Sequence, residues 1–179
     1  MRARATLLGH PIHQMLIPIP IGAFVIAIVL DLVARFRPMP ELAGAATWNG
    51  IVGIVGGLLA AVFGLVDWTK IPRGTRAKRL GVLHALLNVC VVGLFALATA
   101  LRWDNLDRMA TTGVLATELV AVALLSVSGW IGGELLDRLG IGVYDDAHPD
   151  APSSLGEALP PRERRGPPAG GEAGTAHPA

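Results

Sequence analysis

The chain has 179 residues, of which 52% are hydrophobic and 16% charged, and its mean hydropathy is +0.53. These values depart from those of a soluble globular domain and predict that the chain's main partner is a lipid bilayer. The formal net charge of +1 gives no indication of nucleic-acid binding, and the single cysteine, Cys90, excludes an intrachain disulfide.

Four apolar runs predict transmembrane helices at about residues 16–34, 49–67, 80–101 and 112–131. We therefore expect an all-α fold, an integral membrane four-helix bundle with short connections, over residues 1–144. Residues 145–179 are rich in Pro, Gly and Ala and have no apolar period, which predicts a disordered tail. This length leaves no room for a separate soluble enzyme.

Basic residues indicate how the bundle is oriented. Four crossings put both termini on one side, and the short flanks on that side hold eight Lys and Arg residues against four on the other. The positive-inside rule then predicts a multi-pass protein of the cytoplasmic membrane with both termini in the cytoplasm. All four tryptophans fall near the ends of the predicted spans, as in an aromatic belt. They are Trp48, Trp68, Trp103 and Trp130.

Small residues are spaced along the second span, including Gly53, Gly57, Ala60 and Gly64. Such a stripe lets a neighbouring helix approach closely in a membrane. We expect it to pack against helices of the same chain, with a homo-oligomer seam as the alternative.

Polar residues in or near membrane spans are costly and are therefore candidates for function. Six of them lie toward the predicted cytoplasmic ends of the spans, which predicts one polar pocket assembled from all four helices. They are His10, His13, Asp67, His84, Asn88 and Glu134. If residues 9–14 form the start of the first helix, the three-residue spacing of His10 and His13 puts both imidazoles on one face, although Pro18 and Pro20 should reorganise that segment.

Two cofactor sites fit this pocket. A b-type haem would take one axial imidazole from each of two helices, namely His13 and His84, with Asn88 one turn from His84 as an orienting group. A divalent metal ion would instead be bound by His10, His13, Asp67 and His84. Hydrogen bonding between helices is the structural alternative for the same side chains.

A second polar group lies toward the other face, at Asp31, Asn49 and Glu118. A carboxylate at the depth of Glu118 needs a proton or a partner, and a purely structural role is the simpler interpretation. A small proton or solute carrier is a rival function, with Asp31, Asp67, His84 and Glu118 marking its polar path. The other rival is a structural or partner-binding membrane protein.

No catalytic residues are predicted, because the chain has no nucleophile elbow, phosphate-binding glycine loop, CxxC pair or HExxH motif. An enzyme is therefore not favoured. If a haem is bound, we expect a redox partner.

Several motifs resemble the bacterial membrane family called domain of unknown function 2231. The resemblance covers roughly residues 7–143, and its most specific parts are Gly9-His10-Pro11-Ile12-His13 at the start and Gly129-Trp130-Ile131-Gly132-Gly133-Glu134 near the end. Pro20-Ile21-Gly22, Gly64-Leu65-Val66-Asp67-Trp68, and His84 with Asn88 also match. The chain has Gln14 where the family commonly has proline. The resemblance implies a four-helix membrane bundle without an established activity, and a likeness to small four-helix b-type cytochromes favours haem.

Overall fold

The computed structural model describes residues 1–155 and is built almost entirely of helices. A short hairpin precedes five α-helices, and one π-helical turn follows them. The elements are β1 (Thr6–Leu7), β2 (His10–Pro11), α1 (Ile12–Leu16), α2 (Pro18–Phe36), α3 (Pro40–Lys70), α4 (Arg76–Ala100), α5 (Thr112–Gly133) and η1 (Glu134–Arg138). The prediction of an all-α bundle is confirmed.

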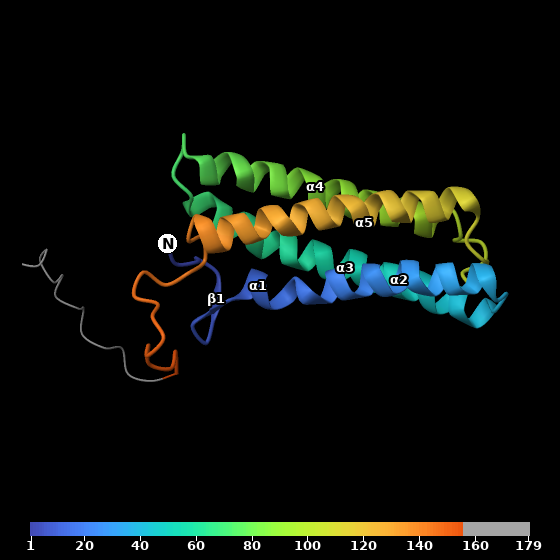
Figure 1. Cartoon of the computed structure of the whole chain (residues 1–179), viewed down its shortest axis with the longest axis horizontal. Helices are drawn as coiled ribbons and strands as arrows, with labels where there is room; N and C mark the ends of the chain where they lie inside the picture. The colour runs from blue at the N-terminus through green and yellow to red at the C-terminus, as the bar shows by residue number, and fades with distance from the viewer. Residues whose placement is uncertain (156–179) are drawn as a thin grey trace, which may run out of the picture.

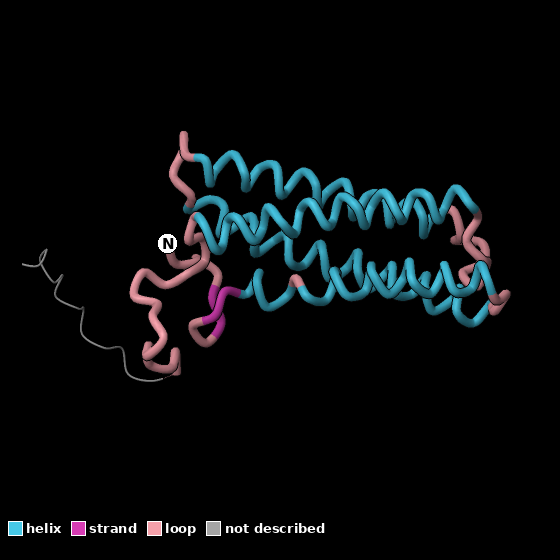
Figure 2. Tube along the Cα trace, viewed as in Figure 1, coloured by secondary structure: helices cyan, strands magenta, loops and turns pink. Residues whose placement is uncertain are grey.

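The helices form four antiparallel rods, of which α1 and α2 together make the first (Figure 1). The α2–α3 pair and the α4–α5 pair have the most extensive contacts. We call the end where α1 and α4 begin and α3 and α5 finish the terminal end, because the N-terminus lies there. The other end, with the α2–α3 and α4–α5 connections, is the opposite end (Figure 2).

All four rods are long and apolar enough to cross a membrane. Many large apolar side chains point outward, among them Leu58, Val62, Leu86, Val89 and Leu119, each exposed by half or more. In water such a surface would be an aggregation hazard, whereas in hydrocarbon it is solvated. Trp48, Trp103 and Trp130 are exposed on the same outer surface.

The second rod is longer than the predicted span. Helix α3 begins at Pro40, with Pro at the first helical position and Glu41 in the first turn, rather than near residue 49. Both residues favour a helix start. Hydropathy missed this part because residues 40–48 are small or polar rather than strongly apolar. Trp48 therefore lies within the helix rather than at its start.

The condition under which His10 and His13 would share a helix face is not met. His10 belongs to β2, which pairs with β1 across a turn at Leu8 and Gly9. Both turn residues have positive φ, 49° and 86°, as a two-residue hairpin turn requires. Helix α1 begins only at Ile12, so His10 and His13 share no helix face. The helix is interrupted at Ile17, directly before Pro18, as the two prolines predict.

The middle of the bundle is an apolar core. Phe24 and Phe95 stack with ring centroids 4.0 Å apart, surrounded by Val91, Ala121 and Leu125.

The small-residue stripe of α3 packs against helices of the same chain. A Cβ at Gly53 would lie 2.5 Å from the Phe24 ring, and one at Gly57 would lie 3.2 Å from Val92. The stripe therefore brings α2 and α4 close to α3, as expected for small residues in membrane helices.

The chain beyond η1 returns to the hairpin. Tyr144 donates a hydrogen bond to the Gly9 carbonyl (2.5 Å), and Ser154 donates one to the Leu8 carbonyl (3.0 Å). The remainder of the predicted disordered tail, residues 156–179, lies outside the described residues.

Candidate functional site

His13 is held against α3 by its Nδ1 edge. Nδ1 lies 2.8 Å from the carbonyl oxygen of Ala60, and because a carbonyl only accepts, Nδ1 is the protonated nitrogen. A Cβ at Gly64, one turn further along α3, would lie only 3.0 Å from His13 Cε1 and Nδ1. Glycine at this position allows the imidazole to reach the α3 backbone.

His84 is held in the same way against α5. Its Nδ1 donates to the carbonyl oxygen of Ser128 (2.9 Å) and lies 3.0 Å from the Ser128 hydroxyl. Asn88, one turn along α4, donates from Nδ2 to Ser128 Oγ (2.6 Å) and to the His84 carbonyl (2.8 Å). A Cβ at Gly132 would lie 3.3 Å from His84 Cε1, so here too a glycine leaves room for the edge of the imidazole ring.

The structure brings His13 and His84 together. Their ring centroids are 6.4 Å apart and their planes are nearly perpendicular, at 85°. Both Nδ1 atoms are committed to carbonyls on other helices, which leaves each Nε2 with its lone pair. Within residues 1–155, neither Nε2 has a hydrogen-bond partner.

This arrangement fits metal ligation. A metal-ligating histidine characteristically donates its other ring N–H to a carbonyl or carboxylate, which fixes the tautomer and the ring orientation. With centroids 6.4 Å apart, the two imidazoles are close enough for one bound group to contact both.

The other predicted members of the pocket have separate partners. Asp67 Oδ1 accepts from the backbone N–H groups of Arg4 (2.6 Å) and Ala5 (2.9 Å), so it fixes the N-terminal segment to the end of α3. His10 Nε2 lies 3.2 Å from the Ser154 hydroxyl, and Glu134 pairs with Arg76 at 2.8 Å. In the part of the chain that the structure describes, no three His, Cys, Asp or Glu side chains are grouped as a metal ion would require.

The opposite end holds a second polar cluster, formed by Asp31, Arg102 and Glu118. Arg102 donates from Nη1 and Nη2 to the two oxygens of Asp31 (2.9 and 2.5 Å), and from Nη2 to Glu118 Oε1 (2.6 Å). All three residues are no more than 2% exposed. Asn49 is not part of the cluster, since its amide donates to the Ala45 carbonyl of its own helix (2.9 Å).

Sequence reasoning missed two members of these clusters. Arg102 is one of the four Lys and Arg residues that the sequence places in the flanks opposite the termini, yet it folds inward from the residue after α4's C-cap. The presence of two carboxylates at one depth, and of an arginine at the adjacent span end, could have identified it. Ser128 was overlooked among the apolar residues of α5, although a serine in a membrane span is itself a candidate for hydrogen bonding.

The residues of the predicted polar path are separated along the bundle. His84 of α4 and Asp67 of α3 lie toward the terminal end, whereas Asp31 of α2 and Glu118 of α5 lie toward the opposite end. The stacked Phe24 and Phe95 rings belong to the apolar core between them.

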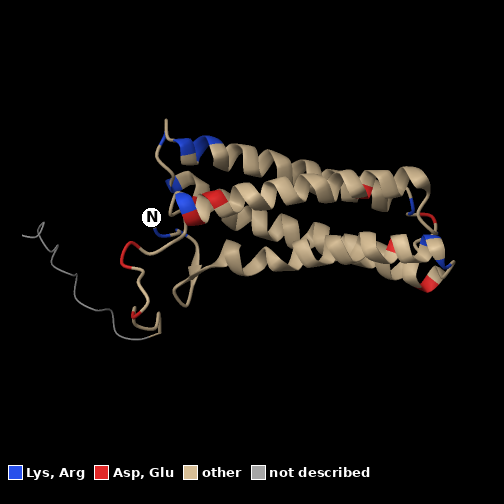
Figure 3. Cartoon of the chain, viewed as in Figure 1, with Lys and Arg blue, Asp and Glu red and all other residues tan. Residues whose placement is uncertain are grey.

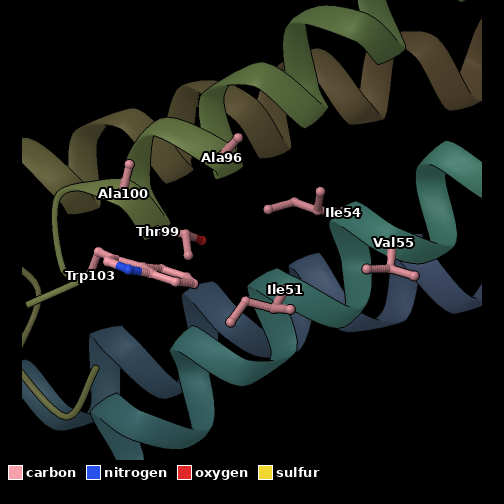
Figure 4. A pocket seen from close by; sticks show the side chains of 7 residues that line it. All are labelled: Ile51, Ile54, Val55, Ala96, Thr99, Ala100 and Trp103. Carbon is pink, nitrogen blue, oxygen red and sulfur yellow. The ribbon is translucent and has the colours of Figure 1, made fainter. Parts of the chain in front are cut away.

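An apolar groove of about 520 Å³ lies between α3 and α4 near the opposite end (Figure 4). It is lined by Ile51, Ile54, Val55, Ala96, Thr99, Ala100 and Trp103. Its lining offers no acid, base or metal ligand, so the histidine pair remains the candidate site.

Comparisons with known proteins agree with the fold. A family model described as predicted membrane protein (DUF2231) matches residues 9–145, which include the histidine pair and the buried cluster. Neither the comparison with curated proteins nor that with solved structures gave a match. The four long apolar helices fit an integral membrane protein, and the chain belongs to the DUF2231 family of predicted membrane proteins.

Proposed function

We propose that His13 and His84 would hold one b-type haem and that the protein carries electrons in the membrane. The observation that carries the proposal is the geometry of the pair, with ring centroids 6.4 Å apart and each Nδ1 directed at a backbone carbonyl. The iron of such a haem supplies one-electron redox chemistry.

Neighbouring residues of the protein would fix the tautomer and orientation of the two imidazoles. The carbonyls of Ala60 and Ser128 fix the tautomer that exposes Nε2, and hydrogen bonding to the far nitrogen makes an imidazole a better ligand. Asn88 holds the Ser128 hydroxyl beside His84, so the α4–α5 half of the site is defined before any ligand is bound.

Two imidazoles alone favour a haem over a bare ion. A structural or catalytic metal ion generally takes three or four protein ligands, whereas a haem iron already has four nitrogens from its macrocycle and needs only two axial groups. Asp67 and His10, the other ligands considered, are engaged with Arg4, Ala5 and Ser154.

Charge supports an orientation with this site near the cytoplasm. Basic residues gather at the terminal end, as Figure 3 shows, and at the end of α3, in the loop after it and at the start of α4 they are Lys70, Arg73, Arg76, Lys78 and Arg79. At the opposite end Arg102 is buried against two carboxylates, so the excess of solvent-facing cations at the terminal end is larger than the sequence count indicates. A redox partner would then approach from the cytoplasmic side.

The test is to purify the full chain in mild detergent from haem-sufficient cells. Visible spectra of the oxidised and reduced protein would be recorded together with haem and metal content. We expect about one haem per chain and a Soret band that shifts on reduction, as for a histidine-ligated haem. The band should be lost in His13→Ala and in His84→Ala, and kept in His148→Ala, which changes a partly exposed histidine outside the bundle.

Other outcomes of this experiment would contradict the haem assignment. Stoichiometric metal without a Soret band, lost in His10→Ala and Asp67→Ala, would replace the haem with the four-ligand metal site. Protein that binds neither haem nor metal would disprove the proposal and favour the carrier or the structural function. For the carrier, pH-dependent flux in proteoliposomes would then be measured.

A further inference from the structure

The buried cluster at the opposite end contains one more negative group than positive ones. Asp31 of α2 and Glu118 of α5 both contact a single guanidinium, that of Arg102, and all three side chains are withdrawn from solvent. With both carboxylates ionised, the cluster would carry a net charge of −1 inside the bundle. An uncompensated buried charge is so costly that the group usually takes up a proton instead.

No other charged group compensates the excess. Helix α3 contributes Thr47 at this end, whose hydroxyl donates to the carbonyls of Ala43 and Leu106 and carries no charge. Helix α4 contributes the neutral Thr99. The remaining charged side chains of the opposite end are exposed to solvent. They are Arg35, Arg37, Glu41, Asp104, Asp107 and Arg108.

The hydrogen bonds distinguish the two carboxylates. Asp31 accepts through both oxygens from Nη1 and Nη2 of Arg102, the bidentate arrangement typical of an ionised pair. Glu118 accepts through Oε1 only. Among residues 1–155, the buried side-chain polar atoms without a partner are Glu118 Oε2 and Arg102 Nε. Glu118 Oε2 is therefore the atom with room for a proton.

This atom lies closer to the opposite end of the bundle than to the terminal end. Glu118 is the seventh residue of α5, about 9 Å along the helix from its first residue at 1.5 Å per residue. Toward the terminal end, the Phe24–Phe95 stack and its apolar neighbours form a layer without polar groups to pass a proton. Exchange with water would therefore take place at the opposite end.

We propose that the Asp31–Arg102–Glu118 cluster is a binding site for a single exchangeable proton, held on Glu118 Oε2 and reached from the opposite end of the bundle. The Asp31–Arg102 ion pair is the fixed part of the site, and Glu118 is the proton-carrying part. The inference depends on the charge balance of this cluster and is independent of any ligand at the histidine pair.

Infrared difference spectroscopy of the full chain in lipid vesicles at neutral pH tests the site. The wild-type minus Glu118→Gln spectrum should contain a carboxylic-acid C=O band equivalent to one group per chain, and the band should shift in D₂O. Glutamine has the shape of the neutral acid and should leave the thermal stability nearly unchanged. A difference spectrum without this carboxylic-acid C=O band, or a band that does not shift in D₂O, would overturn the proposal.

A second variant tests the charge balance and does not depend on Glu118→Gln folding well. In Asp31→Asn the cluster has one cation and one carboxylate, so Glu118 should release its proton and the C=O band should disappear although Glu118 is still present. Asp104→Asn, which changes an exposed carboxylate at the same end, should leave the band intact. Persistence of the band in folded Asp31→Asn would show that the proton is not held by the excess charge and would refute the site.

Discussion

The two ends of the bundle hold polar groups inside an apolar structure in different ways. At the terminal end, imidazoles donate to backbone carbonyls of α3 and α5 and remain half-buried; within residues 1–155 the other nitrogen of each ring has no partner. At the opposite end, charged groups are fully buried and neutralise one another almost completely. Free lone pairs suit the first end to a ligand, whereas a single surplus carboxylate suits the second to a proton.

Among substitutions that test this difference between the two ends, Arg102→Met should have the largest effect on stability. The substitution leaves two buried carboxylates without a cation, and removing one partner of a buried ion pair destabilises proteins by about 3–5 kcal/mol. We expect a large fall in unfolding temperature, measured by circular dichroism in detergent. Arg108→Met is the matched control, because Arg108 pairs with Asp104 at the surface and such pairs are worth about 0–1 kcal/mol. Equal losses in the two variants would mean that the buried cluster is not a stability determinant.

The next largest effect on stability is expected from a substitution that crowds the histidine pair. In Gly64→Ala, a Cβ 3.0 Å from His13 forces the ring or α3 to move, which typically costs about 1–3 kcal/mol. We expect lower stability together with less haem bound per chain. Gly50→Ala on the same helix meets its nearest neighbour, Thr99 Oγ1, at an ordinary 3.6 Å and should leave haem content unchanged. Normal haem content in Gly64→Ala would mean that His13 does not need its place beside α3.

A subtler change is Ser128→Ala. It removes the hydroxyl that accepts from Asn88, but it keeps the carbonyl that accepts from His84. Side-chain hydrogen bonds between membrane helices average about 0.6 kcal/mol and reach about 1.7 kcal/mol. We expect a small loss of stability with haem still bound and a measurable shift of its reduction potential. Ser126→Ala, whose hydroxyl is exposed and donates to Val122 within the helix, should change neither.

The smallest effect is expected for Arg76→Ala. Arg76 pairs with Glu134 at 2.8 Å, but its side chain is more than half exposed. The loss should be within about 1 kcal/mol and should vanish at high salt, where exposed charges are screened. Unfolding temperatures at low and high ionic strength would measure it. A large, salt-independent loss would place a buried ionic contact at the terminal end too and remove the contrast between the two ends.

Hydropathy predicted the four crossings because each apolar run has the length of the hydrocarbon layer. It could not place the start of α3, where small residues and a proline make a helix without a strong apolar run. His13 and His84 were predicted because imidazoles are rare in such spans. Their hydrogen-bond partners were not predicted, because these are the backbone carbonyls of Ala60 and Ser128. Every residue has such a carbonyl, so the sequence does not distinguish these two.

Asp67 was predicted as a ligand but binds backbone N–H groups, since nothing in the sequence shows that residues 4 and 5 return to α3. Arg102 was placed in a loop because its position along the chain is that of a flanking residue. Only the packing of α2 against α5 shows that two buried carboxylates lie close enough to pair with Arg102.

The histidine pair also has a consequence for the order in which the molecule is made. His13 emerges first from the ribosome, but its carbonyl partner at Ala60 arrives with the second crossing, and His84 meets Ser128 only when the fourth crossing is in place. A chain that stops before α5 therefore lacks the carbonyl that anchors His84, and the pair is fully anchored only when all four rods are present.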